Sequence, residues 1–307
     1  MRLLWAEADG NFRLAEFSDE KIPPYAILSH TWGADDEEVS FRDIVDGRGK
    51  NKPGYKKIRF CAQQARKDGL KFFWVDSCCI DKSSSTELSE AITSMFRWYQ
   101  RATKCYAYLS DVSIPKPGIN DPSSCQARKQ RIKSSKWFER SWTLQELLAP
   151  TSVEFFAGEW EPLGNKRTLE KEIHDRTKIT VRALRGMPLS RFSVRERLLW
   201  ARGRQAKREE DKAYSLLGIF GVHMPPVYGK GWKHAFARLR KEINPPMGAQ
   251  FSSHDCSRQF NTFTGTQINN TGSGNILFGS DKQVGYAKFG IDTTFVPSRS
   301  FFLGEAG

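Results

Sequence analysis

The stretch PPYAILSHTWG, residues 23–33, decides the predicted fold. Its apolar run Tyr25–Ser29 stands between two prolines and a polar segment, which is the pattern of a short buried strand. Three more apolar runs of this kind follow along the chain, at residues 72–75, 105–109 and 152–156. Segments with helical spacing separate them, and such alternation predicts right-handed crossovers and a parallel sheet. We therefore predict a flavodoxin-like α/β sandwich over residues 25–156.

The segments around these strands predict further elements. A short strand is expected at Phe12–Phe17. A helix is expected between Pro53 and Gly69, because proline favours a helix start and glycine a helix end. Ser84 is positioned to cap a second helix. Residues 110–134 are rich in basic residues, proline and serine, and predict a long loop.

The stretch KWFERSWTLQELLAP, residues 136–150, predicts a helix that carries an unexpected acid. Serines before it can cap its start, and its final proline can end it. Trp142 and Glu146 are four residues apart, so a carboxylate is expected one helical turn from an indole ring. Burying an unpaired carboxylate is costly. Two explanations remain open: Glu146 lines a pocket, or it forms an ion pair with Arg140 or another surface arginine.

The carboxyl ends of the predicted strands hold the candidate binding residues, because ligands of such sheets bind beyond those ends. The first strand leads into Ser29, His30, Trp32 and Gly33, and the second leads into Asp76. A turn with glycine can approach a phosphate, and histidine can donate a hydrogen bond or carry a charge. The alternative is that His30 and Asp76 only hold neighbouring loops. No metal site is expected, because no histidine lies near the six cysteines at ligand spacing. The cysteines are expected to be free thiols.

Beyond residue 160 the pattern predicts helices up to residue 243, as an extension of the same domain. Ser193 and Glu196 form a predicted capping box. The REED run, residues 208–211, is predicted to be an exposed helix start. The sequence Asn-Pro-Pro at residues 244–246 marks a boundary. We thus expect one domain over residues 1–243 and a low-complexity tail over residues 244–307.

The tail contains an uncharged segment, NTFTGTQINNTGSGNILFGS, at residues 261–280. It holds four Asn, four Thr and four Gly, with β-forming residues separated by turn residues. Short uncharged segments of this kind favour cross-β stacking. The tail is therefore expected to be disordered or to form amyloid. A stray hairpin is the alternative.

Composition limits the classes of function. The formal net charge is +13, and the excess lies in residues 1–243. Attraction to an anionic partner is one explanation, and a solvated surface is the other. No nucleic-acid-binding motif is present, so no nucleic acid is expected as a partner. No apolar run is long enough to cross a membrane, and the acidic start does not resemble a signal peptide. We expect a cytoplasmic protein.

Four stretches together resemble the fungal heterokaryon incompatibility (HET) domain. They are PPYAILSHTWG, FFWVDSCCIDK, ERSWTLQELLAPTSVEFF and REEDKAYSLLGIFGVHMPPVYGKG. The resemblance covers roughly residues 1–243. It implies an effector of programmed cell death that acts when genetically different hyphae fuse or when a sensor is activated.

The tail segment FTGTQINNTGSGN resembles the sigma-type prion amyloid motifs that fungi use in signalling. The resemblance implies a motif at about residues 258–279, self-association through the tail, and a nucleotide-binding oligomerisation receptor that carries a matching motif. The chain itself has no phosphate-binding GxxxxGK[ST] loop. The residues expected to form the motif are Phe263, Gln267, Asn269, Asn270 and Asn275.

The HET domain is in turn similar to the TIR fold. Enzymatic TIR domains carry a glutamate on the helix after the third strand, within an S-x-W-C-x-x-E-L pattern, and use it to cleave the N-glycosidic bond of NAD. Trp142 and Glu146 match that pattern in spacing, while Thr143 replaces its cysteine and Ser141 adjoins the tryptophan. The resemblance implies that Glu146 is catalytic and that NAD is a substrate, with no cofactor. The expected substrate-binding residues are Ser29, His30, Trp32, Gly33, Asp76 and Trp142.

Two functions remain open. The domain is either a TIR-like NAD glycohydrolase that clustering of the tails activates, or a non-enzymatic interaction module. In the second case its clustering would recruit partners or disturb a membrane.

Overall fold

The fold is that of a computed structural model, which describes residues 1–114 and 122–244 of the 307-residue chain. The chain divides into two units, Met1–Ala249 and Gln250–Gly307. All of the described residues belong to the first unit. The predicted amyloid motif lies outside them.

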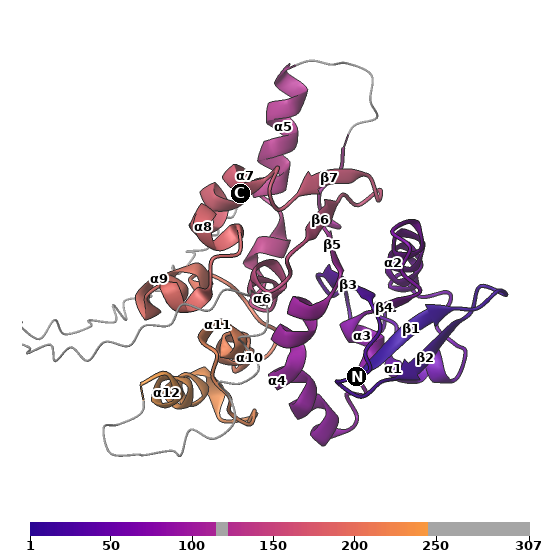
Figure 1. The fold of residues 1–307 in the computed structure, drawn as a ribbon, viewed down its shortest axis with the longest axis horizontal. Helices are drawn as coiled ribbons and strands as arrows, with labels where there is room; N and C mark the ends of the chain where they lie inside the picture. Colours follow the sequence, from indigo (N-terminus) through magenta and orange to yellow (C-terminus); the bar gives the residue numbers. More distant parts are fainter. Residues whose placement is uncertain (115–121, 245–307) are drawn as a thin grey trace, which may run out of the picture. The chain divides into compact units, whose positions relative to one another are not determined.

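In the described residues, seven strands form one mixed sheet in the order β2-β1-β4-β3-β5-β6-β7 (Figure 1). The strands are β1 (Arg2–Ala6), β2 (Phe12–Glu16), β3 (Tyr25–His30), β4 (Phe72–Trp74), β5 (Lys104–Tyr108), β6 (Val153–Phe156) and β7 (Pro162–Asn165).

The four central strands are parallel to one another. Ile27 of β3 pairs with Trp74 of β4 on one side and with Cys105 of β5 on the other. These are the four strands that the apolar runs predicted, so the α/β class is confirmed. The parallel prediction holds only for this centre, because β1, β2 and β7 pair antiparallel at the two edges.

Helices cover both faces of the sheet (Figure 1). The helix α2 (Tyr55–Lys67) lies on one face, and α4 (Ser85–Arg101) and α6 (Thr143–Leu148) lie on the other. Two further short helices, α1 (Phe41–Val45) and α3 (Asp76–Cys79), follow β3 and β4. All six residues of β3 are buried. The carboxyl end of β3 therefore lies at the middle of the sheet, with the pair α4 and α6 beside it.

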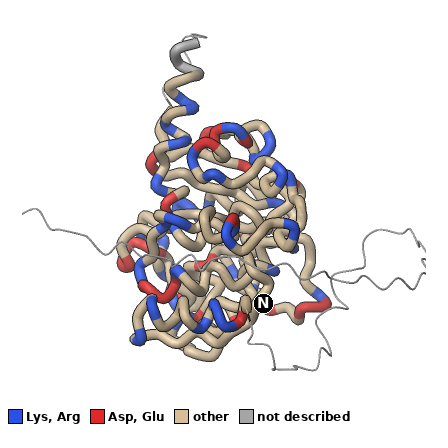
Figure 2. Tube along the Cα trace, turned by 90° about the vertical axis from the view of Figure 1, so that its left-hand side faces the viewer, with Lys and Arg blue, Asp and Glu red and all other residues tan. Residues whose placement is uncertain are grey.

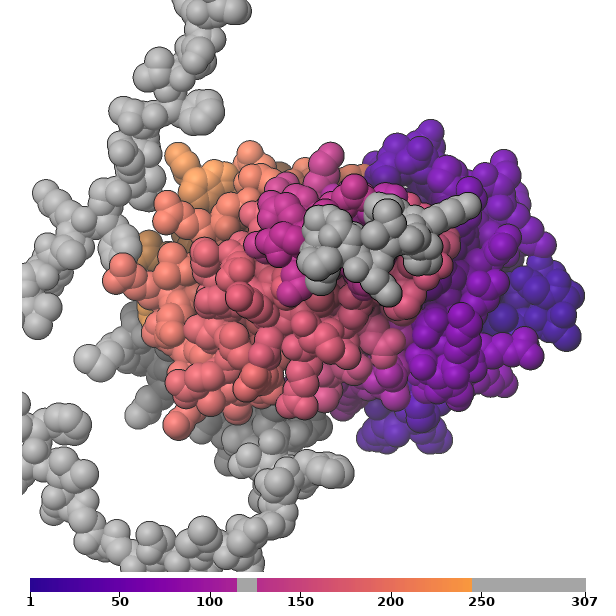
Figure 3. All heavy atoms as spheres, turned by 90° about the horizontal axis from the view of Figure 1, so that it is seen from above, coloured from indigo at the N-terminus to yellow at the C-terminus, as the bar shows by residue number. Residues whose placement is uncertain are grey.

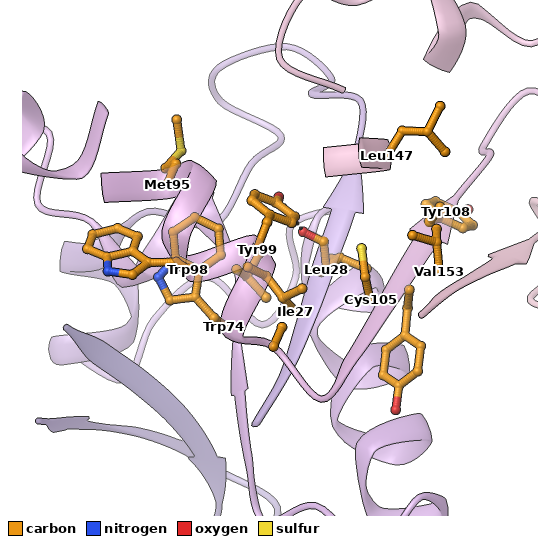
Figure 4. Close-up of a cluster of buried hydrophobic side chains, with 14 of the residues drawn as sticks. Ile27, Leu28, Trp74, Met95, Trp98, Tyr99, Cys105, Tyr108, Leu147 and Val153 are labelled. Carbon is orange, nitrogen blue, oxygen red and sulfur yellow. Dashed lines mark hydrogen bonds between the residues drawn. The ribbon is translucent and has the colours of Figure 1, made fainter. Parts of the chain in front are cut away.

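The core between the sheet and α4 is aromatic. Trp74 packs edge-on against both Trp98 and Tyr99 of α4. Figure 4 shows the Tyr99 ring directed at β3, where its hydroxyl donates to the Leu28 carbonyl at 3.0 Å. Cys105 lies beside this cluster and is a free buried thiol, like Cys61, Cys78 and Cys79. The buried hydroxyl bond fixes α4 against the strand that leads to the site.

The predicted helix over residues 136–150 is interrupted. A 3-10 turn, η1 (Lys136–Glu139), is separated from α6 by residues 140–142, of which Arg140 is extended. The break follows from tertiary pairing, because Gln205 donates to Glu139 O at 2.5 Å and accepts from Ser141 N at 2.8 Å. The predicted helix therefore does not begin at residue 136. Glu146 lies on the shorter helix α6, and Trp142 is its N-cap residue.

The predicted loop over residues 110–134 contains a helix, α5 (Pro122–Lys133). The amphipathic pattern that would have announced it is missing from its sequence, PSSCQARKQRIK. α5 projects from the rest of the fold and packs near its base on α7 (Figure 1). The prediction of a structureless connection was therefore wrong for this part.

The extension after the sheet is helical apart from β7, which was not predicted. Its capping box of Ser193 and Glu196 is confirmed. Gly218 lies against α4 so closely that an added Cβ would approach the Phe96 Cβ to 2.1 Å. The helices of the extension are α7 (Glu170–Thr177), α8 (Val181–Leu184), η2 (Leu189–Arg191), α9 (Val194–Ala201), α10 (Asp211–Tyr214), α11 (Leu217–Phe220) and α12 (Gly231–Ile243).

The β1–β2 hairpin and the extension lie at opposite ends of this unit, as the indigo and orange atoms of Figure 3 show. In the view of Figure 2, Lys and Arg are interspersed with Asp and Glu along the described trace. Within residues 1–114 and 122–244, no helix combines the length and hydrophobicity that crossing a bilayer requires.

Candidate active site

A pocket of about 420 Å³ lies beyond the carboxyl ends of β3 and β4. Its walls come from α4, from the segment that includes α6, and from the extension between η2 and α12. Pockets of this size hold small-molecule ligands in many proteins. Its lining comprises His30, Trp32, Asp35, Asp76, Ile80, Lys82, Leu88, Ala91, Ile92, Met95, Arg140, Trp142, Thr143, Glu146, Lys207, Arg208, Asp211 and Tyr228.

Glu146 of α6 is 5% exposed and lines this pocket. Ser29 donates its hydroxyl to Glu146 Oε2 at 2.5 Å, and Trp137 Nε1 donates to the same hydroxyl oxygen at 2.9 Å. No cation lies within ion-pair distance of Glu146 among the described residues. Of the two explanations for this acid, the geometry matches the pocket and not the ion pair with Arg140.

Burial raises the pKa of the Glu146 carboxyl to about 8, and the negative charge of Asp76 adds to the effect. The hydrogen bond from Ser29 and the charge of Arg140 act in the opposite direction. Desolvation therefore dominates. At neutral pH the Glu146 carboxyl is protonated in most molecules, and a positive charge nearby would favour release of this proton.

Asp76 begins α3 directly after the second predicted strand. His30 Nε2 lies 2.9 Å from its Oδ1, and Trp32 Nε1 donates to its Oδ2 at 2.8 Å. Although burial favours the neutral acid, the charge and hydrogen bond of His30 hold the pKa of Asp76 below its usual value. His30 Nδ1 is buried and has no hydrogen-bond partner among the described residues.

The two acids of the pocket therefore differ in protonation. Asp76 is ionised and oriented by two N–H groups, whereas Glu146 is held neutral by its surroundings. Such separation of two carboxyl pKa values is a recurring arrangement in acid–base active sites. It gives the pocket a proton donor and a fixed negative charge at neutral pH.

The structure brings most of the predicted site residues together. His30, Trp32, Asp76, Trp142 and Glu146 line one pocket. Ser29 lies behind Glu146 as its hydrogen-bond donor.

Gly33 is placed differently from the other predicted residues. It is absent from the pocket lining, and its N–H donates to Glu38 Oε1 at 2.8 Å, so this amide is not free to bind a phosphate.

Lys166, which follows β7, is hydrogen-bonded to the carboxyl end of α6. Its buried ammonium donates to Leu147 O at 3.2 Å and to Pro150 O at 2.5 Å. Burial lowers the pKa of Lys166 to about 8. Two carbonyls at the carboxyl end of the Glu146 helix are thus satisfied by one side chain.

Sequence reasoning missed the wall that the extension contributes. Arg208 and Asp211 belong to the REED run, which was predicted to be an exposed helix start. The helix α10 does begin at Asp211 and Arg208 is exposed, but both residues also line the pocket. Tyr228 donates to Asp211 Oδ1 at 2.8 Å. Lys207 pairs with Asp35 at 2.7 Å and so ties the extension to the loop after β3. Arg208, Asp211 and Tyr228 lie in the stretch REEDKAYSLLGIFGVHMPPVYGKG, which resembles the HET domain, but its local pattern does not predict that they approach His30, more than 170 positions away in the sequence.

Within the described part of the chain, no group of three or more His, Cys, Asp or Glu side chains is arranged to hold a metal ion.

Comparison with known proteins identifies the domain. Residues 25–119 match the family model "Heterokaryon incompatibility protein (HET)". The chain is also 57% identical over 250 residues to "Vegetative incompatibility protein HET-E-1" of Podospora anserina. That match covers 81% of this chain but only 18% of the relative. No solved structure matches the chain. The chain therefore contains a heterokaryon incompatibility (HET) domain.

Proposed function

We propose that this chain is an effector of heterokaryon incompatibility that kills by hydrolysing NAD in the pocket around Glu146. The observation that carries the proposal is the position of Glu146 on the wall of a ligand-sized pocket, where it is buried and has no cation partner among the described residues. The match to a vegetative incompatibility protein supports the biological setting.

The chemistry of the bond suits this carboxyl. Cleavage of an N-glycosidic bond leaves positive charge on the ribose, and a nearby carboxylate stabilises that charge. NAD also carries a cationic nicotinamide ring, so its binding would draw the proton from Glu146. Asp76 adds a fixed negative charge in the same pocket, and Trp142 supplies an aromatic surface beside it.

The likeness to TIR domains gains support from topology. In chain order the four parallel strands are arranged 2-1-3-4, which is the beginning of the flavodoxin-like order. Glu146 lies on the last helix before the fourth parallel strand. Thr143, which replaces the cysteine of the TIR pattern, donates to Trp137 O at 2.6 Å. The substitution thus serves the local fold and leaves the carboxyl in place.

Activation by the tail is the second half of the proposal. Stacking of tails would raise the local concentration of the attached domains by orders of magnitude. A receptor with a matching motif would template this assembly. The motif lies outside the described residues, and its support is the composition of residues 261–280.

The proposal is tested by measuring NAD in cells that express the full chain under forced clustering. Wild type should deplete NAD and kill, and Glu146→Gln should do neither. Glu154→Gln is the matched control, because Glu154 pairs with Lys104 outside the pocket. Killing at normal NAD levels would overturn the enzymatic proposal and favour the interaction module.

A further inference from the structure

We propose that Arg140, Lys82 and Arg208 form a subsite for the diphosphate group of a nucleotide ligand in this pocket. The inference deepens the proposed function and rests on it for the choice of a nucleotide. It adds to the proposed function that the diphosphate group gives the ligand its affinity, and it names the side chains that recognise this group.

Arg140 is the first of these cations. It is half-buried on the pocket wall, and its guanidinium has no carboxylate within 4 Å among the described residues. Its backbone is held firmly, since Arg140 O accepts from Arg204 Nη1 at 2.9 Å, and the same Nη1 donates to Thr143 Oγ1 at 3.0 Å. A fixed backbone with an unpaired guanidinium is prepared for a ligand oxygen.

Arg140 also lies close enough to the reacting carboxyl to matter. Its positive charge is one of the influences that oppose the raised pKa of Glu146. An anion bound at Arg140 would therefore sit near Glu146 without being in contact with Asp76, which His30 and Trp32 already occupy.

Lys82 and Arg208 lie on aromatic rings instead of on acids. Lys82 Nζ is 3.6 Å from the centroid of the Trp32 ring, and Arg208 Cζ is 4.4 Å from the centroid of the Tyr228 ring. No carboxylate lies within 4 Å of either cation in the described residues. Stacking of this kind orients a cation and leaves its N–H groups free to donate sideways.

No acid of the pocket lies within 4 Å of these three cations among the described residues, although Asp76 and Asp35 attract Lys82 at longer range. Asp35 pairs with Lys207, Asp211 accepts a hydrogen bond from Tyr228, and Glu146 accepts one from Ser29. Asp76 is used by two N–H groups. The pocket thus offers three cations that have no carboxylate within 4 Å in the described residues, although Lys82 also donates to Ser77 O at 3.4 Å. They lie beside an apolar wall of α4 that includes Leu88, Ile92 and Met95.

This combination fits a nucleotide diphosphate better than a simple anion. Two guanidinium groups can each bind phosphate oxygens in a fork, and an ammonium adds a point charge. The three side chains come from three separate segments, so an anion with several oxygens would use more of them than a single carboxylate could. The apolar wall and Trp142 would receive the attached ring.

Binding is measured by calorimetry on the full-length Glu146→Gln variant, so that the result does not depend on hydrolysis. The probes are ADP-ribose, inorganic pyrophosphate and adenosine. ADP-ribose should bind at least about tenfold more tightly than adenosine. Pyrophosphate should compete with ADP-ribose, and added salt should weaken the binding of ADP-ribose and of pyrophosphate. Equal affinity for ADP-ribose and adenosine would overturn the inference.

Substitutions locate the subsite. Arg140→Gln in the Glu146→Gln background should weaken ADP-ribose binding about tenfold and leave adenosine unchanged. Arg208→Gln should act in the same direction, which keeps the test valid if the first variant does not fold. Arg202→Gln is the control, because Arg202 is exposed and lies outside the pocket. If ADP-ribose binding is insensitive to both pocket substitutions, the inference is wrong.

The result separates this inference from the proposed function. If ADP-ribose binds through Arg140 and Arg208 but wild type leaves NAD intact, the subsite stands and the hydrolase proposal falls. If wild type hydrolyses NAD but neither arginine affects binding, the opposite conclusion follows.

Discussion

Replacing Glu146 with glutamine should stabilise the folded chain at alkaline pH. The side chain is buried beside Ser29 and has a pKa of about 8 in the fold, against an ordinary value of 4.5. The folded protein therefore keeps this proton up to about pH 8, while an unfolded chain releases it near pH 4.5. The unfolding free energy must fall as the pH rises through that window, because the unfolded state is the one that loses the proton first.

The magnitude follows from the two pKa values. As the pH rises from about 5.5 to about 8.5, the titration of Glu146 alone lowers the unfolding free energy of the wild type by about 3 kcal/mol. Glutamine is similar in shape, can still accept a hydrogen bond from Ser29, and does not titrate. The advantage of Glu146→Gln over the wild type should therefore grow by that amount over this range.

The assay is urea unfolding of the full chain, followed by tryptophan fluorescence at several pH values. Other groups titrate in the same range, among them Lys166, but they contribute equally to both proteins. Glu154→Gln serves as control, and its difference from the wild type should stay constant. A constant difference for Glu146→Gln as well would show that Glu146 ionises like an exposed acid, and the argument from burial would be refuted.

Three other predictions follow from the site and the tail. If the ionised form of Glu146 supports catalysis, kcat/KM for NAD should rise about tenfold per pH unit up to about pH 8 and then level off, as initial rates will show; a flat profile would exclude that role. Lys166→Met should lower the unfolding free energy by about 1–3 kcal/mol, because two buried carbonyls lose their donor; unchanged urea midpoints would contradict this. A peptide of residues 258–279 should form fibrils with the cross-β spacings in X-ray diffraction, and a peptide that stays monomeric at high concentration would count against signalling through the tail.

The central strands could be predicted from sequence because burial on both faces leaves a continuous apolar run between turn residues. The edges could not. β7, Pro162–Asn165, has a single buried residue, Leu163, so its sequence carries no strand pattern. The break between η1 and α6 was also beyond local reasoning, since Gln205 causes it from more than 60 residues away.

For the site, the rule that ligands bind beyond the carboxyl ends of strands led to His30 and Asp76, and the spacing of Trp142 and Glu146 led to the buried acid. The protonation of that acid could not be foreseen, because it depends on how completely Ser29 and its neighbours exclude water. Gly33 was expected near a phosphate, but the side chain of Glu38 takes its amide. The cations of the extension approach the pocket only through tertiary packing.

The close packing of Gly218 against Phe96 matters for the design of truncated forms of this protein. A fragment trimmed to the segment that the HET family model matches, residues 25–119, would omit Glu146, Arg208 and Tyr228. Inactivity of such a fragment would say nothing about the chemistry, because much of the pocket wall would be missing. A larger residue at position 218 should instead displace the extension from α4 while every side chain that lines the pocket is still present.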